Sequence, residues 1–481
     1  MSRDGTRRGG PRPGPRSGGR PPRSRPRVDP ARLAAYDVLR AVATEDAYAN
    51  LVLPQRLEAR RLAGRDAAFA TELTAGTLRR LGTYDAILAA CARRPTGRID
   101  PPVLDALRLG AHQLLAMRVP SHAAVGTTVD LVRQEVGHGP AGFVNAVLRR
   151  VADQPLDAWV RAVAPDPVTD PRGFAAVAQS HPRWVVDALA EALGERVGEL
   201  EELLAADNEA PRVTLVARPG LADRDELLAA EGAESTAYSP IGVTLGSGDP
   251  GALAAVRTGR AGVQDEGSQL VALAALAVPV AGADAAWLDT CAGPGGKAAL
   301  LGAEAARRGA HVLAGERAPH RATLVERAVA AVPRGVVEVV TADATRPPWS
   351  DASFDRVLVD APCSGLGALR RRPESRWRRS ATDVEDLVPL QRELLDRALD
   401  ATRPGGVTAY VTCSPVLAET AEVVRHVLGS REDVELLDAD EVAAGVLGQV
   451  PDHEGPLPGT VQLWPHRHGT DAMFLALLRR R

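Results

Sequence analysis

The spacing of apolar residues divides the chain into two regions with different predicted secondary structure. From Pro30 to about residue 151, apolar residues recur every three or four positions, as Leu33, Tyr36 and Leu39 do, which is typical of amphipathic helices. From about residue 271, short apolar runs alternate with helical segments, which is the pattern of a parallel sheet with crossover helices. We therefore expect an all-α bundle followed by an α/β Rossmann-like domain.

The segments between and within these regions complete the expected organisation. A small α+β unit with its linker is expected over residues 156–270, between a bundle at 30–155 and an α/β domain at 271–481. A late antiparallel strand pair is expected to close one edge of the α/β sheet, over residues 461–464 and 473–478. The other expected strands occupy 286–289, 312–315, 336–340, 356–360 and 407–412, and the expected helices include 295–308, 319–331 and 384–401.

Charge is distributed unevenly along the chain. The net charge of the 481 residues is −3, but residues 1–27 hold nine arginines and one aspartate, which leaves −11 on the other 454 residues. Residues 1–29 are almost devoid of apolar side chains, so we expect a disordered Arg/Gly/Pro-rich tail. Such a tail is either merely solvated or an accessory contact to RNA phosphates.

Composition also limits the classes of protein that the chain can represent. An apolar content of 45% is sufficient for packed cores, and no apolar run is long enough to cross a bilayer. The N-terminus lacks the apolar core of a signal peptide, so we expect a cytoplasmic protein without membrane contact. Four cysteines without a C-x-x-C pair indicate reduced thiols and no metal site.

A glycine-rich turn follows the first expected strand of the α/β domain. Asp289 ends the strand, and the turn Gly293-Pro-Gly-Gly-Lys297 opens the next helix, where free backbone N–H groups can meet a ligand. The turn matches neither the phosphate-binding P-loop nor the dinucleotide-binding fingerprint, because other residues stand where these motifs require glycine or a hydroxyl side chain. Lys297 is also the single lysine of the chain, beside 57 arginines. Either chance or a need for a compact ammonium group explains its retention.

Acidic residues end the next two expected strands. Glu316 could accept hydrogen bonds from ribose hydroxyls, and Asp343 could meet an adenine edge. A turn with two such acids suits an adenosine ligand without a pyrophosphate. S-adenosyl-L-methionine is such a ligand.

Three of the four cysteines follow expected strands: Cys291, Cys363 and Cys413. Methylation of carbon 5 of a pyrimidine requires a thiolate that adds to carbon 6, and a free thiol is only about 3% ionised at pH 7. Cys413 precedes Ser-Pro and a helical run expected from Val416, so a helix N-terminus could lower its pKa. A single strand-end cysteine is more often a packed apolar residue, and we assign Cys291 to that class. Asp360, ahead of Cys363, could bind the base edge.

An arginine-rich run follows the Pro-Cys motif. It contains Arg370, Arg371, Arg372 and Trp377. It is either a solvated loop or a surface on which unpaired RNA bases stack and phosphates bind.

These motifs together resemble the Sun family of RNA cytosine-C5 methyltransferases. Residues 30–151, with Phe143-Val-Asn-Ala-Val-Leu, resemble the NusB-type RNA-binding bundle of its RsmB branch, which acts on 16S ribosomal RNA. The resemblance implies that Cys413 is the nucleophile, that Cys363 assists product release, and that Asp360 contacts the base or the methyl donor. It further implies contacts to S-adenosylmethionine from Cys291, Ala292, Gly293, Pro294, Gly295, Gly296, Lys297, Glu316 and Asp343.

The chain departs from the family pattern at a few positions, and other functions stay open. Gly293 stands where the family motif C-A-A-P-G-G-K has its second small residue, an alanine. Glu316 stands where the family has an aspartate at the ribose position, and Glu419-Thr420 stands where an acid–Asn pair is expected. The same chemistry on transfer RNA is one alternative. A non-catalytic NusB-like RNA-binding or assembly factor is another, which the intact reactive residues oppose. Neither the methylated nucleotide, nor free RNA versus a particle as substrate, nor the oligomeric state follows from the sequence.

Overall fold

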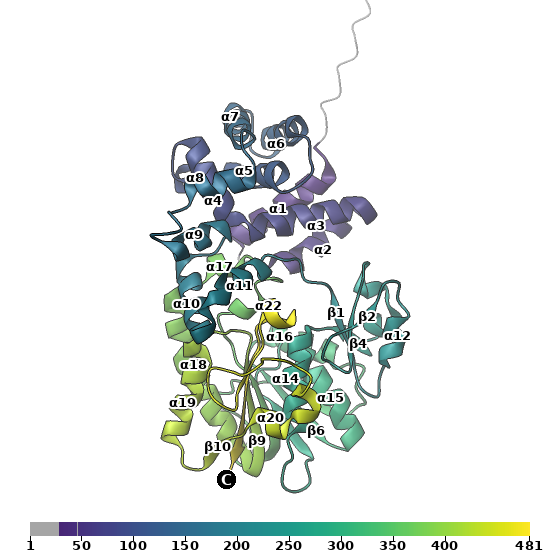
Figure 1. The fold of residues 1–481 in the computed structure, drawn as a ribbon. Helices are drawn as coiled ribbons and strands as arrows, with labels where there is room; N and C mark the ends of the chain where they lie inside the picture. Colours follow the sequence, from purple (N-terminus) through teal and green to yellow (C-terminus); the bar gives the residue numbers. More distant parts are fainter. Residues whose placement is uncertain (1–27, 46) are drawn as a thin grey trace, which may run out of the picture.

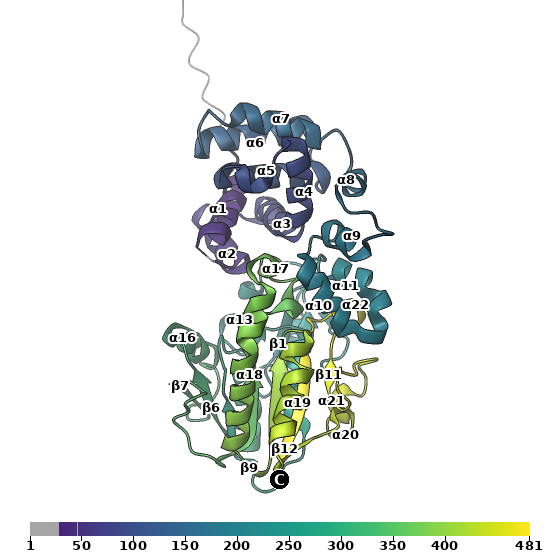
Figure 2. The ribbon, with the colours of Figure 1, turned by 90° about the vertical axis from the view of Figure 1, so that its left-hand side faces the viewer.

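The computed structural model describes residues 28–45 and 47–481 of the chain. The expected Arg/Gly/Pro-rich tail lies outside the described residues up to position 27. A helical bundle occupies one end of the molecule and a helix-covered sheet the other, with α17 (Ser375–Arg378) between them (Figures 1 and 2).

The N-terminal bundle is formed by helices with local start signals and one apolar face. Helix α1 begins at Pro30 because the Asp29 carboxylate caps the Ala31 N–H and proline suits the first helical turn. The buried core includes Tyr84, Ile87 and Leu107, none of which is exposed. The helices of this region are α1 (Pro30–Thr44), α2 (Ala49–Ala59), α3 (Gly64–Arg79), α4 (Leu81–Ala92), α5 (Pro101–Leu115), α6 (Ser121–Glu135) and α7 (Ala141–Val151), with a 3₁₀ turn η1 (Thr96–Arg98).

A connecting set of short helices leads to a small antiparallel sheet. Its strands are ordered β2-β3-β1-β4, and it lies to one side of the large sheet (Figure 1). The connecting elements are α8 (Leu156–Val163), α9 (Pro171–Ala178), α10 (Arg183–Leu193), η2 (Gly194–Glu199) and α11 (Leu200–Ala206). The sheet unit contains β1 (Thr214–Ala217), α12 (Arg224–Leu228), β2 (Glu234–Ser235), β3 (Gly242–Thr244), η3 (Pro250–Ala252), α13 (Ala254–Arg257) and β4 (Ala261–Val263).

The large sheet has the order β10-β12-β9-β8-β5-β6-β7, with β11 paired to β12. Strands β9, β8, β5, β6 and β7 run parallel, whereas β12 is antiparallel to both β9 and β10. Its strands are β5 (Ala286–Asp289), β6 (His311–Glu316), β7 (Val337–Thr341), β8 (Phe354–Asp360), β9 (Thr402–Thr412), β10 (Val434–Leu436), β11 (Val461–Gln462) and β12 (Phe474–Arg480). Its helical elements are α14 (Glu266–Ala277), α15 (Gly296–Arg308), α16 (Pro319–Ala328), η4 (Leu366–Ala368), α17, α18 (Ala381–Ala401), η5 (Leu417–Glu419), α19 (Ala421–Ser430), α20 (Ala439–Val442), α21 (Ala444–Leu447) and α22 (Pro465–His468).

Helices cover both faces of this sheet. Val357 and Val359 of β8 point into a core with α18 and α19, while Leu358 points into a second core with α14 and α15. Strand β8 is therefore buried along its whole length until Asp360, as expected of a central strand in a parallel sheet. Figure 2 shows α18 and α19 lying across one face.

The structure adds one strand to the expected edge of the sheet. The late pair is antiparallel, as expected, with β11 paired to β12 and β12 to β9, but β10 was not expected and pairs with the later residues of β12. Three residues are too few for β10 to show an alternating pattern in the sequence. Strand β9 begins five residues earlier than expected, at Thr402, and its Pro404-Gly405-Gly406 start is the kind of sequence that normally indicates a loop.

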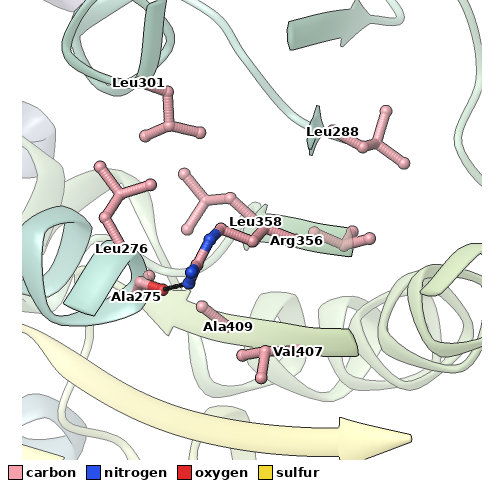
Figure 3. A pocket seen from close by; sticks show the side chains of 9 residues that line it. Ala275, Leu276, Leu288, Leu301, Arg356, Leu358, Val407 and Ala409 are labelled. Atoms are coloured by element: carbon pink, nitrogen blue, oxygen red, sulfur yellow. Dashed lines mark hydrogen bonds between the residues drawn. The ribbon is translucent and has the colours of Figure 1, made fainter. Parts of the chain in front are cut away.

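A small cavity beneath α14 is not a ligand site. Its volume is about 10 Å³, and apolar side chains such as Leu288 and Leu301 line it (Figure 3). Arg356 crosses it, donating to the Ala275 carbonyl at 2.9 Å and to the Asp284 carboxylate at 2.7 Å. A space of this size holds one water molecule at most. Across the described residues, no helix combines the length and apolarity needed to cross a membrane, and no metal-binding group of three side chains is present.

Candidate active site

The ends of three neighbouring strands bring the sequence motifs together. Strands β5, β8 and β9 are adjacent, and the glycine-rich turn, the Pro-Cys loop and the Thr-Cys segment follow their carboxyl ends. The Sγ atoms of Cys363 and Cys413 lie 3.4 Å apart, and neither cysteine forms a disulfide. The expected convergence of the motifs at neighbouring strand ends is thus what the structure has.

The two thiols differ in acidity. The hydrogen bond from Cys363 lowers the pKa of Cys413, and the Lys297 ammonium lowers it further against the effects of burial and Asp360. The same hydrogen bond, together with burial, raises the pKa of Cys363 well above its ordinary value. Cys413 is therefore the thiol that ionises first, with Cys363 as its donor.

The cause of this acidity differs from the expected one. A helical run was expected to begin at Val416, but the segment after Ser-Pro forms only the 3₁₀ turn η5, and α19 begins at Ala421. A helix N-terminus therefore does not adjoin Cys413. The Cys363 thiol and the Lys297 ammonium group, instead of a helix N-terminus, stabilise the Cys413 thiolate.

Lys297 connects the glycine-rich turn to the Pro-Cys loop. It lies in the first turn of α15, and its Nζ donates to Asp360 Oδ2 at 2.8 Å. Burial lowers the pKa of Lys297, but the charge and hydrogen bond of Asp360 outweigh burial, so the pKa is raised. Asp360 Oδ1 accepts no hydrogen bond from the described residues, and the carboxylate is 28% exposed. One carboxylate oxygen is thus left to face a ligand.

The glycine-rich turn packs too closely for side chains. A Cβ at Gly293 would lie 2.2 Å from Glu316 Oε2, and Gly295 has a φ of +109°, in the left-handed region. The buried Glu316 accepts from the Gly293 N–H at 3.1 Å and from the Ala318 N–H at 3.0 Å. The turn and the acid at the end of β6 therefore form one contiguous wall of the crevice.

Asp343 extends this wall beyond the next strand. Its Oδ1 accepts from the backbone N–H and the hydroxyl of Thr345, at 3.0 and 2.8 Å. These hydrogen bonds lower the pKa of Asp343, so the group is a carboxylate at neutral pH. The Ala342 N–H donates to the Glu316 carbonyl, which holds the two strand ends together.

Cys291 differs from the other two site cysteines. Burial raises its pKa to about 12, so the thiol stays protonated. Its backbone N–H donates to Asp289 Oδ1 at 3.3 Å. This environment is that of a packed thiol and matches the class to which Cys291 was assigned.

Two acidic residues of the site were not singled out as functional from the sequence. Asp289 is fully buried, its Oδ2 has no hydrogen-bond partner among the described residues, and burial together with Asp360 raises its pKa to about 7. Glu419 is also fully buried and binds the residues that follow both reactive cysteines. The sequence offered one indication for each residue: Asp289 lies shortly before the glycine-rich turn, and Glu419 lies shortly after the Thr-Cys motif.

The structure corrects the expected position of the arginine-rich run. Arg370 is 7% exposed and donates to the Gly469 carbonyl, and Arg371 pairs with Asp265 and Asp471. Trp377 packs against Gly82 of the bundle and is partly buried. Among the residues of this run that were expected to contact RNA, only Arg372 is retained as a candidate. Its side chain is exposed and lies over the ring of Tyr48.

Comparison with known proteins identifies the family. The family described as "16S rRNA methyltransferase RsmB/F" matches residues 278–479, and the NusB family matches residues 29–153. Ribosomal RNA small subunit methyltransferase B of Pseudomonas putida is 34% identical over 414 residues, covering 83% of this chain and 90% of its own. The chain belongs to the RsmB/F family. The expected fold class and the resemblance drawn from the motifs are confirmed.

Two other proteins match over nearly the whole chain. A putative methyltransferase of Mycobacterium tuberculosis is 54% identical over 459 residues, covering 95% of this chain and 98% of its own. The crystal structure of PH0851 matches the fold with a TM-score of 0.76 at 20% identity, over 94% of this chain and 99% of that one. Members of the RsmB/F family are S-adenosylmethionine-dependent rRNA methyltransferases, so this chain is an enzyme with an RNA substrate.

Proposed function

We propose that the enzyme methylates carbon 5 of a specific cytosine in 16S ribosomal RNA through a covalent adduct. The observation that supports this most directly is the contact between two thiols of unequal acidity, 3.4 Å apart, beside the Lys297–Asp360 pair. A pyrimidine C5 is a poor nucleophile until a thiolate adds to C6, and two thiols allow one to attack and the other to act in release. The rRNA substrate makes the cytoplasm the expected place of action.

Cys413 is the proposed nucleophile. Its Sγ forms a bond to C6, which raises the electron density at C5 so that C5 takes the methyl group. S-adenosylmethionine, when bound, supplies that methyl group as an electrophile. Asp360, whose Oδ1 accepts no hydrogen bond from the described residues, holds the N3–N4 edge of the base, and Lys297 holds Asp360 in place.

Cys363 is assigned to release, in which the C5 proton leaves and the C6–S bond breaks. In the resting enzyme, the hydrogen bond to Cys413, burial and the Cys413 charge raise the pKa of Cys363. Once Cys413 is bonded to carbon, the hydrogen bond to a thiolate and its charge are both lost. Cys363 can then lose its own proton to solvent and, as a thiolate, accept the C5 proton. The electrons of the C5–H bond re-form the C5=C6 double bond, the C6–S bond breaks, and Cys413 departs as the thiolate.

The residues around the glycine-rich turn fit the methyl donor. The turn lacks space for a Cβ at Gly293, a carboxylate ends β6 and another follows β7. We propose that residues 291–297 bind its amino-acid part, that Glu316 binds its ribose and that Asp343 lies at its adenine. Such carboxylates bind hydroxyl and amino groups and favour a ligand without phosphates.

In this proposal, each region of the chain has its own function. Residues 30–155 form the RNA-binding bundle, residues 156–270 the linker and small α+β unit, and residues 271–481 the catalytic domain. Exposed Arg372, between the bundle and the Pro-Cys loop, contacts the RNA backbone.

Trapping of the adduct tests the chemistry. Unmethylated 16S rRNA and S-adenosylmethionine are incubated with wild type, Cys363→Ala, Cys413→Ala and, as a matched control, Cys91→Ala in the bundle core. We expect a denaturant-resistant RNA adduct to accumulate with Cys363→Ala and to be absent with Cys413→Ala, whereas Cys91→Ala behaves like wild type. The reverse pattern for the two site variants would overturn the assignment of roles.

Mapping of the product tests the substrate. Bisulfite sequencing of 16S rRNA and of transfer RNA treated with the wild-type enzyme should show one protected cytosine in 16S rRNA. Protection confined to transfer RNA would favour the alternative substrate, and no protection in either RNA would oppose cytosine-C5 methylation.

A further inference from the structure

A single buried carboxylate joins the two loops that carry the reactive thiols. Each thiol is followed by a serine, Ser364 after Cys363 and Ser414 after Cys413. The Ser364 and Ser414 hydroxyls both donate to Glu419 Oε2, at 2.5 and 2.6 Å. The Ser364 backbone N–H donates to Oε1 at 2.7 Å. Glu419 therefore holds the position next to each thiol.

Further hydrogen bonds fix this carboxylate from the opposite side. Gln391 of α18 donates to Glu419 Oε1 at 3.1 Å and to the Pro362 carbonyl at 2.9 Å. The Tyr410 hydroxyl donates to the Glu419 carbonyl at 2.8 Å. Glu419, Ser414 and Gln391 have no exposed surface, so water does not compete for these bonds. Four donors converge on two carboxylate oxygens in a dry site, where such bonds are strong.

We propose that Glu419 is a positioning residue that holds Cys363 and Cys413 at contact distance and thereby makes the two-thiol reaction possible. The inference rests on the proposed function for its catalytic meaning, but the spacing of the thiols is a property of the protein alone. Adduct formation and release act on adjacent carbons of one ring, so both thiols must face that ring at the same time. A displacement of about 1 Å in such a site costs about 100-fold in rate.

The charge and acceptor character of Glu419 matter as well as its size. A glutamine at this position presents one acceptor oxygen and one NH₂ donor. An NH₂ group that faces the Ser364 N–H and the Gln391 amide meets two donors. An NH₂ group that faces the two serine hydroxyls can donate to them, but neutral hydrogen bonds then replace the charge-assisted ones. Either arrangement weakens the hold on at least one of the two loops, although the side-chain volume is unchanged.

A bifunctional alkylating reagent measures the thiol spacing without RNA. Dibromobimane joins two neighbouring thiols, releasing two bromide ions, and mass spectrometry identifies the Cys363–Cys413 product. The variants are Glu419→Gln, Glu419→Asp, and the matched control Glu422→Gln, which makes the same change on the exposed side of α19. Methylation of 16S rRNA and binding of S-adenosylmethionine are measured on the same preparations.

We expect the Cys363–Cys413 bimane product to form about 10-fold more slowly in Glu419→Gln, and methylation kcat to fall about 100-fold, while KM for the methyl donor changes less than about twofold. Glu419→Asp retains an acceptor-only carboxylate on a shorter side chain and should recover part of both rates. Glu422→Gln should match wild type in every measurement. Unchanged bimane bridging in Glu419→Gln would refute the proposal, whatever happens to methylation.

Two single-hydroxyl variants cover the case in which Glu419→Gln does not fold. Ser364→Ala and Ser414→Ala each remove one donor and little volume, and each should slow bridging by a smaller factor. If neither alters bridging in a folded protein, the carboxylate does not set the thiol spacing. Normal bridging in wild type with no methylation of any RNA would instead count against the proposed function and leave this inference standing.

Discussion

Replacement of Gly82 tests the contact between the bundle and the catalytic domain. Gly82, in the first turn of α4, lies against Trp377 of α17, and a Cβ at this position would be 2.2 Å from Cη2 and 2.5 Å from Cζ2 of the indole. Ordinary contacts begin near 3.4 Å, so alanine must displace the ring by about 1 Å or more. The ring has little freedom, because Glu374 is bonded to the Ala49 N–H at 3.0 Å and Arg376 is fully buried.

The expected cost follows from two opposing effects. Overpacking costs about 1–3 kcal/mol, whereas alanine in place of glycine in a helix gains up to about 1 kcal/mol. We therefore expect Gly82→Ala to destabilise the wild-type protein by about 1–2 kcal/mol. In a Trp377→Ala background the obstacle is gone, and the same substitution should be neutral or stabilising by up to about 1 kcal/mol.

A double-mutant cycle in urea, with hydrogen exchange of α4 and α17 as the local measurement, gives the coupling energy between the two sites. The control is Gly126→Ala in α6, where a Cβ meets nothing within 4 Å and alanine should stabilise the helix. If Gly82→Ala stabilises the wild-type protein as Gly126→Ala does, or if its effect is the same with and without Trp377, the contact is not present as described. Affinity for S-adenosylmethionine should be unaffected in all four proteins of the cycle, because the contact lies outside the crevice.

Three further predictions concern titration. Lys297→Met removes a cation that lowers the pKa of Cys413, so the pH midpoint of Cys413 alkylation by iodoacetamide should move upward; an unchanged midpoint would contradict the role of the ammonium. Cys291 should resist the same reagent up to high pH, because burial raises its pKa to about 12, and rapid labelling at pH 8 would be inconsistent with that environment. Burial raises the pKa of Asp207 to about 7, so its stabilising contribution is complete below about pH 4 and is lost as the pH rises through 7. The free energy of unfolding of Asp207→Asn should therefore rise relative to that of wild type as the pH increases from about 4 to about 7, and the difference should stay level at higher pH. A difference that shrinks between about pH 4 and 7 would contradict this sign.

The parallel part of the sheet could be predicted because its information is local. Each central strand is a short apolar run, and the chemically distinctive residues follow it directly, as Cys363 follows β8 and Cys413 follows β9. The outer strands could not be predicted equally well. Strand β10 has three residues, and β9 begins with a proline and two glycines that only its pairing with β8 accommodates, through a register shift between Phe354 and Arg356.

The support of the site was less predictable, because it depends on contacts between distant parts of the chain. Glu419 follows the Thr-Cys motif closely, but its partners Ser364 and Gln391 come from a different loop and from α18. The closeness of Glu419 to the Thr-Cys motif does not by itself show that this glutamate is buried and that Glu422, three residues later, is exposed. Only the tertiary structure shows that one carboxylate receives both thiol loops.

The environment of the arginine-rich run also could not be predicted from the local sequence. Composition indicates a solvated or RNA-binding segment, whereas Arg376 is fully buried and donates to the carbonyls of Ser180 and Asp207 and to Asn208, which ties the segment to the connecting helices. Cys363 lies thirteen residues before Arg376, on the other side of η4. The Gly367 N–H in the same segment donates to the Cys413 carbonyl at 2.9 Å. Residues 363–377 thus carry Cys363 at one end and the contact with the bundle at the other. Because this one segment joins α17 to the thiol pair, Gly82→Ala is expected to slow methylation as well as to weaken the contact with the bundle.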